Sequence, residues 1–220
     1  MTGPFQLEPI GIIRTPYINK YDAPRQPRVD ARVDEAYVEL YPHRNYEQAL
    51  RDVDGCDRIW LITYFDRAAG WKPLILTPRD RTKRGLFATR SPHRPNPIGL
   101  TCVELVSVKG LKVVVKGTDL LDRTPVLDIK PYLAYADAFP HSQVQWVEQL
   151  NQRPTYQVVW SDKGLALPVD VREHAERVLS ADPFPHPYRR IEQRPDGDYT
   201  IAIREYRVSF RVTEDTVTIL

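Results

Sequence analysis

The chain has 220 residues, of which 42% are hydrophobic and 27% charged, and its formal net charge is +2. These values are typical of an ordinary soluble globular protein with one full domain and a smaller second one, and they exclude a strongly basic tail. Cys56 and Cys102 form no Cys-x-x-Cys pair and the five histidines lack metal-ligand spacing, so we expect a reducing compartment and no metal. We also expect no membrane span and no signal peptide, because no apolar stretch approaches 18 residues and no basic segment precedes an apolar run.

The first predicted elements are short strands separated by long connections. Apolar patterning predicts strands over 5–13 and 36–41, and a short helix over 46–53 that is capped by Asn45. The connection 14–34 holds two aromatic residues and a Pro-Arg-Gln-Pro group, which indicate order, and a mobile basic loop is the alternative. Residues 58–65 form a nearly continuous apolar run, which predicts a strand buried on both faces that ends at Asp66.

The pattern of short strands continues along the chain. Strands are predicted over 74–76, 99–109, 111–116 and 126–132, with a turn over 118–125. Asp128 and Lys130 share one face of the last of these strands, while Leu127 and Ile129 mark the core-facing side. Later predictions are a helix over 142–151, a strand over 156–160, a helix from an Asp170 N-cap to Leu179, and strands over 199–211 and 216–220.

This order of elements predicts a mainly β protein. We expect an N-terminal β-barrel, or a compact sandwich, over residues 1–145, a linker over 146–155, and a small C-terminal α+β domain over 156–220. A glycine-rich dinucleotide fingerprint and a P-loop are both missing, so neither a Rossmann domain nor a phosphate-binding loop is supported.

The most unusual stretch is Phe87 to Gly99, which holds three prolines, two arginines, an asparagine and a histidine. Each proline fixes φ and restricts the residue before it, so this stretch is predicted to be a stiff loop. A stiff loop suits a ligand site, because Arg90, Arg94 and Asn96 would lose little entropy on binding. A proline-rich turn with its arginines in solvent is the alternative.

A basic run precedes the proline-rich stretch. Residues 79–84 carry four positive charges and one negative charge, which favours contact with phosphates. The candidate RNA-binding residues are Arg79, Arg81, Lys83, Arg84 and Arg94. A solvated loop is the alternative interpretation.

Four motifs together resemble one known family. They are APRQP at 23–27, FATRSPHRPNPIGL at 87–100, DLLDRTPVLDIKPY at 119–132 and DPFPHPY at 182–188. They are similar to the TsaA-like family, also called TrmO, whose members are S-adenosylmethionine-dependent tRNA methyltransferases. The resemblance implies a cytoplasmic β-barrel enzyme, acting as a homodimer, that methylates N6 of N6-threonylcarbamoyladenosine at position 37 of threonine tRNA.

The resemblance also implies where the methyl donor binds. The family's donor-contacting positions fall on Ala23, Pro24, Arg25, Phe65, Asp66, Arg90, Leu100, Lys116, Gly117, Thr118 and Asp119. Two positions depart from the family pattern: Arg123 stands where relatives often have glycine, and Asp66 stands where a relative carries histidine. Because arginine adopts positive φ less freely than glycine, we expect a different local turn at Arg123.

A proton acceptor would help the N6 nitrogen to attack a methyl group. Asp128 is the candidate base, and Lys130 and Asn96 are candidates for orienting the substrate. A structural Asp128–Lys130 pair is the alternative. At the level of function, the alternatives are a barrel methyltransferase with another substrate and a non-catalytic RNA-binding barrel.

Overall fold

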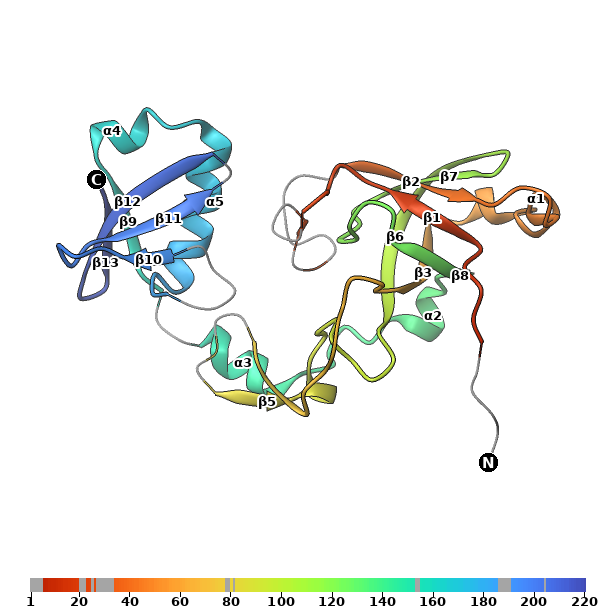
Figure 1. Ribbon diagram of the computed structural model, residues 1–220, viewed down its shortest axis with the longest axis horizontal. Coiled ribbons are helices and arrows are strands. Elements are labelled where there is room, and N and C mark those ends of the chain that lie inside the picture. The colour runs from red at the N-terminus through yellow and green to blue at the C-terminus, as the bar shows by residue number, and fades with distance from the viewer. Residues whose placement is uncertain are drawn as a thin grey trace. The chain divides into compact units, whose positions relative to one another are not determined.

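The computed structural model describes residues 6–19, 23, 24, 26, 34–77, 80, 82–152, 155–185, 191–203 and 205–220. The chain divides into two compact units, shown in Figure 1. The first unit contains Met1–Pro73 and Arg90–Pro140, and the second contains Leu74–Thr89 and His141–Leu220. The second unit therefore takes a short segment out of the middle of the first.

The first unit is a closed β-barrel, as the sequence predicted. Its strands follow the order β1-β2-β7-β6-β3-β8 around the barrel, and every neighbouring pair is antiparallel. The strands are β1 (Gly11–Arg14), β2 (Glu35–Leu40), β3 (Arg58–Tyr64), β6 (Ile98–Lys109), β7 (Lys112–Lys116) and β8 (Pro125–Pro131). Closure removes the exposed strand edges that a sandwich of short strands would leave.

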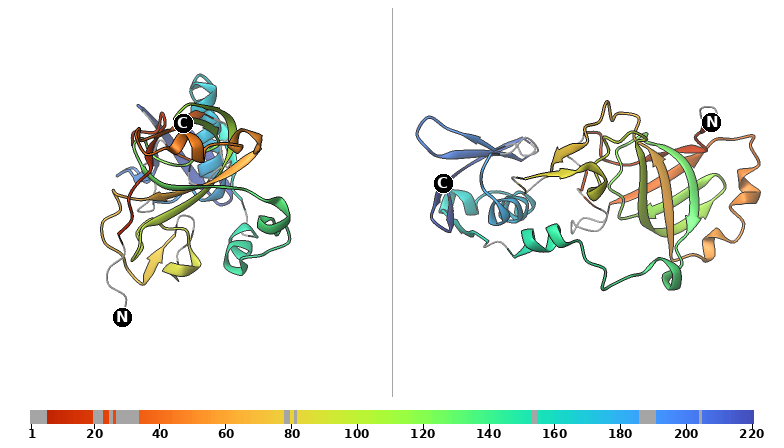
Figure 2. Two further views of the ribbon diagram at one scale, coloured as in Figure 1. Left: turned by 90° about the vertical axis from the view of Figure 1, so that its right-hand side faces the viewer. Right: turned by 90° about the horizontal axis from the view of Figure 1, so that it is seen from below.

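Antiparallel pairing places three connections at the same end of the barrel. These connections are β1–β2, β3–β6 and β7–β8, and we call this end the loop end (Figure 2). The opposite end carries the tight β6–β7 turn and the β2–β3 connection, which contains α1 (Tyr46–Ala49) and the 3-10 turn η1 (Val53–Gly55). The short helix α2 (Ala134–Asp137) follows β8.

The barrel core consists of alternate residues from each strand. Ile13, Val38, Leu61, Val103 and Val113 are completely buried in one cluster. In β3 the inward residues are buried while those between them face outward, and Tyr64 is exposed. The prediction of a strand buried on both faces is therefore wrong, because a barrel wall covers one face and the apolar outer residues remain at the surface.

Two local predictions in this unit are also wrong. Strand β1 begins at Gly11, and described residues 6–10 form no strand, which fits the missing N–H of Pro9. Asn45 lies at the N-cap of α1 but makes no side-chain cap bond, because its φ of 61° turns the backbone left-handed. Arg123 likewise adopts φ 67°, so the turn accepts arginine in the left-handed conformation.

The second unit contains a small hairpin and a five-stranded sheet. The hairpin pairs β4 (Leu74–Leu76) with β5 (Lys83–Gly85) and continues into the 3-10 turn η2 (Leu86–Ala88). Helix α3 (Gln145–Asn151) contacts this segment, because Trp146 Nε1 donates to the carbonyl of Ala88 at 3.2 Å. Lys83 and Arg84 thus belong to a strand, whereas the alternative interpretation of the basic run was a solvated loop.

The sheet of the second unit has the order β10-β11-β12-β13-β9. Its strands are β9 (Gln157–Trp160), β10 (Ile191–Gln193), β11 (Tyr199–Ile203), β12 (Tyr206–Thr213) and β13 (Thr216–Ile219). The unit also contains the helices α4 (Asp162–Leu165) and α5 (Val169–Ala181). Val171, Ala175 and Leu179 of α5 are buried in the same cluster as Phe210. Helix α5 begins at Val169 with Pro168 at the N-cap, so the prediction of an Asp170 cap is wrong.

None of the helices in the described part of the chain has the length and apolar content needed to cross a membrane.

Candidate functional site at the loop end of the barrel

The loop end gathers the sequence motifs that stood far apart in the chain. The APRQP motif lies in the β1–β2 connection, the proline-rich stretch leads into β6, and the DLLDRTP motif leads into β8. The barrel topology thus brings three motifs that are separate in sequence to the same end of the barrel.

Asp119 is the carboxylate most withdrawn from water at this end. Its Oδ1 accepts a hydrogen bond from Thr101 Oγ1 at 3.0 Å, and Thr101 itself is buried on the inner face of β6. Burial raises the pKa of Asp119 above its usual value, and this effect outweighs the opposing influences of Thr101 and Arg90. A carboxylate held this way is suited to a cationic or hydroxyl-bearing ligand that restores the lost solvation.

Arg90 connects the proline-rich stretch to the first motif. Its Nη1 donates to Oε1 of Gln26 at 3.0 Å, and its charge acts on Asp119. Residues Ala23, Pro24 and Gln26 of the first motif are half-buried, and Arg25 lies outside the described residues. Arg90 of the proline-rich stretch thus contacts Gln26 of the first motif and acts electrostatically on Asp119 of the third.

Because Gly99 has no side chain, Thr63 and Phe65 can pack closely against its backbone. A Cβ at Gly99 would collide with Thr63 Oγ1 and with the ring of Phe65. Thr63 is completely buried, and its hydroxyl finds no hydrogen-bond partner within the described parts of the chain. Phe65 continues the pairing of β3 beyond its end, because its N–H donates to the carbonyl of Pro97 at 2.8 Å.

The predicted catalytic pair lies on the outer wall of the barrel. Asp128 Oδ2 is 3.0 Å from Lys130 Nζ, and both side chains are about half exposed or more, at 49% and 64%. Strand register places Ile62 opposite both Asp128 and Leu100, and Leu100 is 61% exposed on that wall. Asp128 and Leu100 are thus two strands apart on one face, roughly 10 Å by ordinary strand spacing.

The remaining predicted donor residues of the loop end, and the predicted orienting residue Asn96, lie in its connections. Lys116, Gly117 and Thr118 lead from β7 to Asp119, and the Thr118 hydroxyl accepts from the N–H of Leu120 at 3.2 Å. Gly117 has φ 75°, which turns the chain sharply there. Asp66 and Asn96 are exposed, in the connection from β3 to β6.

One residue of the basic run, Arg84, makes contacts within the protein. Arg84 Nε lies 2.7 Å from Oδ2 of the buried Asp80, and its guanidinium stands over the Trp146 ring. Lys83 is exposed, Arg94 Nη1 donates to the carbonyl of Ser91 at 3.5 Å, and Arg79 and Arg81 fall outside the described residues. Arg84 thus holds the hairpin against α3.

Sequence reasoning missed three residues at the loop end. Thr101 and Thr63 are inward positions of strands, where a threonine in a β pattern carries no visible signal. The third, Arg67, donates from Nη2 to the carbonyl of Asp122 at 2.8 Å and from Nη1 to the carbonyl of Ile18 at 3.3 Å. Its position directly after Asp66 was the signal that could have found it.

Within the described residues, no group of three or more histidine, cysteine, aspartate or glutamate side chains is arranged to hold a metal ion.

Comparison with known proteins identifies close relatives of this arrangement. The family model "tRNA-methyltransferase O N-terminal domain" matches residues 12–138, which span the barrel. The chain is 35% identical over 230 residues to the tRNA (adenine(37)-N6)-methyltransferase of Escherichia coli, covering 96% of this chain and 94% of that protein.

Two further matches differ in extent. A "Probable S-adenosyl-L-methionine-binding protein" of Archaeoglobus fulgidus is 42% identical over 146 residues, which cover 66% of this chain but only 39% of that protein. A crystal structure of TrmO from Pseudomonas aeruginosa superposes with a TM-score of 0.61 at 31% identity, covering 99% of this chain and 97% of that one. The match therefore includes the second unit as well as the barrel.

Proposed function

Because the chain belongs to the tRNA-methyltransferase O family, we propose that it is an S-adenosylmethionine-dependent methyltransferase acting on adenine 37 of tRNA. The acceptor in this proposal is N6 of N6-threonylcarbamoyladenosine in threonine tRNA. The observation that carries the proposal is the convergence of the three motifs around Asp119 at the loop end.

The residues at the loop end fit the proposed donor. The donor has an ammonium, a carboxylate, a ribose diol and an adenine, and its sulfonium supplies an electrophilic methyl group. Asp119 can bind the ammonium or the diol, Arg90 can bind the carboxylate, and Phe65 offers an apolar surface.

The acceptor would approach from the outer wall. Leu100 and Asp128 lie on that wall with Ile62 between them, so a base splayed out of an anticodon loop could reach both. Asp128 would remove the N6 proton, while Lys130 and Asn96 would orient the carbamoyl oxygens. Most of the rate gain would come from positioning, since methyl transfer needs the nitrogen in line with the breaking bond.

The test of the proposal is a methyl-transfer assay with purified protein and threonine tRNA. We expect labelled methyl on tRNA that already carries the threonylcarbamoyl group and little on tRNA that lacks it. Methylation of both tRNAs alike would contradict the proposed acceptor. Absence of methylation together with tight tRNA binding would favour a non-catalytic RNA-binding barrel.

Substitution Asp128→Asn tests the proposed base. We expect kcat to fall about 100-fold or more, since general bases contribute at least that factor. The donor Kd by calorimetry should stay within about twofold of the wild-type value, because Asp128 is proposed to act on the acceptor. Normal turnover would leave Asp128 and Lys130 as a structural ion pair.

A matched control for this variant lies on the same outer wall. Glu104 forms an ion pair with Arg58, at 3.5 Å, and is half exposed like Asp128. Glu104→Gln removes a comparable charge and should leave kcat unchanged. An equal loss of kcat in both variants would show that neutralising either ion pair on this wall impairs the enzyme, and that Asp128 has no special role.

We further propose that the protein acts as a homodimer. Tyr64, Ile98 and Val106 are apolar outer residues of β3 and β6 besides Leu100, and each is more than 40% exposed. A row of exposed apolar residues on one wall is typical of a surface that another chain covers. Sedimentation equilibrium showing only monomers at micromolar concentration would contradict this proposal.

We also propose that the enzyme acts in the cytoplasm, because its proposed substrate is a tRNA. Cell fractionation that finds the protein outside the soluble cytoplasmic fraction would contradict that placement.

A further inference from the structure

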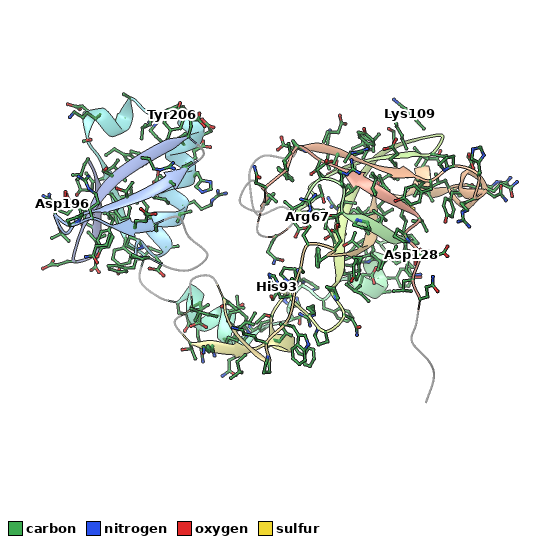
Figure 3. The ribbon with its side chains drawn as sticks, viewed as in Figure 1. Arg67, His93, Lys109, Asp128, Asp196 and Tyr206 are labelled. Carbon is green, nitrogen blue, oxygen red and sulfur yellow. The ribbon has the colours of Figure 1, made fainter. Side chains whose placement is uncertain are left out.

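Arg67 lies where the chain leaves the barrel between β3 and β6. It follows Asp66 directly and is itself exposed. Figure 3 shows it at the loop end of the barrel, away from Lys109 at the opposite end. Neither its charge nor its exposure sets it apart from other surface arginines, but its contacts do.

The two contacts of Arg67 go to two different loops. Nη2 donates to the carbonyl of Asp122 in the β7–β8 connection at 2.8 Å, and Nη1 donates to the carbonyl of Ile18 in the β1–β2 connection at 3.3 Å. Arg67 itself belongs to the β3–β6 connection. One guanidinium therefore joins the three connections that carry the donor-site motifs.

Backbone contacts reinforce the junction on one side. The N–H of Asp122 donates to the carbonyl of Tyr17 at 2.8 Å, and the N–H of Thr15 donates to Oδ1 of Asp122 at 3.1 Å. These bonds tie the β1–β2 connection to the β7–β8 connection. Arg67 adds the β3–β6 connection, from which Phe65 and Arg90 reach the site.

We propose that Arg67 is a positioning residue for the methyl donor, which fixes the three motif-bearing loops in their binding arrangement before the donor arrives. This inference rests on the proposed function. Without the junction the loops would have to be ordered on binding, and part of the binding free energy would be spent on that ordering. Arg67 therefore raises donor affinity without touching the donor.

Arginine is the side chain that this role requires. Its planar fork presents separate donors in fixed directions, so it can serve two carbonyls on different loops at once. Lysine carries the same charge as a single flexible point and should hold one carbonyl at most in good geometry. Charge alone thus predicts equal behaviour of Arg67→Lys and the wild type, whereas the junction predicts different behaviour.

The first measurement compares donor binding and kinetics in Arg67→Ala, Arg67→Lys and the wild type. Loss of two hydrogen bonds of ordinary strength should raise both the Kd and the KM for the donor roughly 10- to 30-fold in the alanine variant. The lysine variant should fall between the two. At saturating donor, kcat should stay within about threefold of the wild-type value, because donor binding restores the loop arrangement.

The second measurement is amide hydrogen exchange of the protein without donor. The N–H groups of Asp122 and Thr15 should exchange several-fold faster in Arg67→Ala than in the wild type, while barrel-strand amides should be unchanged. Added donor at saturation should restore most of that protection. A role confined to overall stability would instead speed exchange across the barrel and would not separate KM from kcat.

The matched control is Arg58→Ala. Arg58 starts β3, the strand that precedes Arg67, and its guanidinium pairs with Glu104 instead of loop carbonyls. Donor affinity and loop exchange should be unchanged in this variant. A donor Kd in Arg67→Ala equal to that of the wild type would overturn the inference and leave the proposed function intact, whereas a wild-type protein that binds no donor would overturn both.

Discussion

At the scale of single residues, the burial of Asp119 lowers the stability of the protein at neutral pH. Its carboxylate is largely buried, and burial raises its pKa above the usual value of 3.8 despite the hydrogen bond from Thr101 and the charge of Arg90. The native state therefore holds this proton more tightly than the unfolded chain does. Stability contributed by Asp119 is lost as the pH rises from 3.8 through the raised native pKa.

Substitution Asp119→Asn should therefore stabilise the donor-free protein at neutral pH. The amide can still accept from Thr101 but cannot ionise, so its Tm should exceed that of the wild type at pH 7. The difference should shrink as the pH falls through the raised native pKa of Asp119, below which the wild-type carboxyl is also protonated. Thermal unfolding across this pH range measures the effect.

Donor affinity should change in the opposite direction in the same variant. The proposed ammonium or diol contact needs the carboxylate, so the donor Kd of Asp119→Asn should rise at least 10-fold. Thr101→Val is a companion variant, because removing its hydrogen bond should move the pH interval upward. A lower Tm of Asp119→Asn at pH 7 would contradict the account of Asp119.

Sequence reasoning identified Asp119 but not its surroundings. The DLLDRTP motif pointed to the residue, whereas Thr101 and Thr63 stand in strands where their type is unremarkable. Their importance comes from the inward direction of their side chains at the loop end. That direction depends on barrel register, which a single sequence does not reveal.

At the scale of elements, strand positions were predictable and strand environments were not. The run 58–65 was correctly predicted as a strand, but continuous apolar character suggested burial on both faces. The alternation seen in β3 has Trp60 and Ile62 on the outer wall. An apolar residue indicates burial or an exposed binding surface equally well, so the pattern alone could not separate the two.

The β7–β8 turn contains an arginine in the left-handed conformation, which leads to a prediction about stability. Arg123 has φ 67° and is exposed, so it carries the strain that a side chain has in the left-handed region. Arg123→Gly should relieve about 1 kcal/mol of this strain and raise the Tm by roughly 2–4 °C. Thermal unfolding of the variant checks the change.

The control for this turn is an exposed arginine outside the left-handed region. Arg44 lies between His43 and Asn45, which both have positive φ, but is not itself among the described residues with positive φ. Arg44→Gly should lower the Tm slightly, because glycine adds backbone entropy to the unfolded chain. Stabilisation by both substitutions would point to the loss of positive charge as the cause.

At the scale of the whole molecule, sequence motifs predicted the barrel and the family, while their meeting point came from topology. The order β1-β2-β7-β6-β3-β8 brings the motifs to one end, although the chain separates them by dozens of residues. The assignment of Leu74–Thr89 to the second unit was not visible in the sequence. It depends on long-range packing around Trp146, which local patterns do not encode.

The basic run leads to a prediction about RNA binding by the intact protein. Simultaneous replacement of Arg79, Arg81 and Lys83 by glutamine should weaken tRNA binding and flatten its dependence on salt. If each side chain neutralises one phosphate, the slope of log K against log salt should fall by about 2 to 3. Arg84 is left unchanged, because its ion pair with Asp80 supports the hairpin.

The control for that variant removes equal charge from the barrel, at the end that lies opposite the loop end. Arg44, Arg51 and Lys109 are exposed there, in the β2–β3 connection and at the end of β6. Their replacement by glutamine should change the salt slope far less. Equal slopes in the two triple variants would mean that tRNA responds to total charge and not to the basic run.

The β6–β7 turn is a suitable place to insert a label into this protein. Gly110 has φ 57°, and nothing lies within 4 Å of the place where a side chain would project. The turn sits at the end of the barrel that lacks the motif loops, and exposed turn tips of this kind tolerate inserted sequence. A fluorophore or an affinity peptide inserted there would label or immobilise the enzyme without covering the loop end.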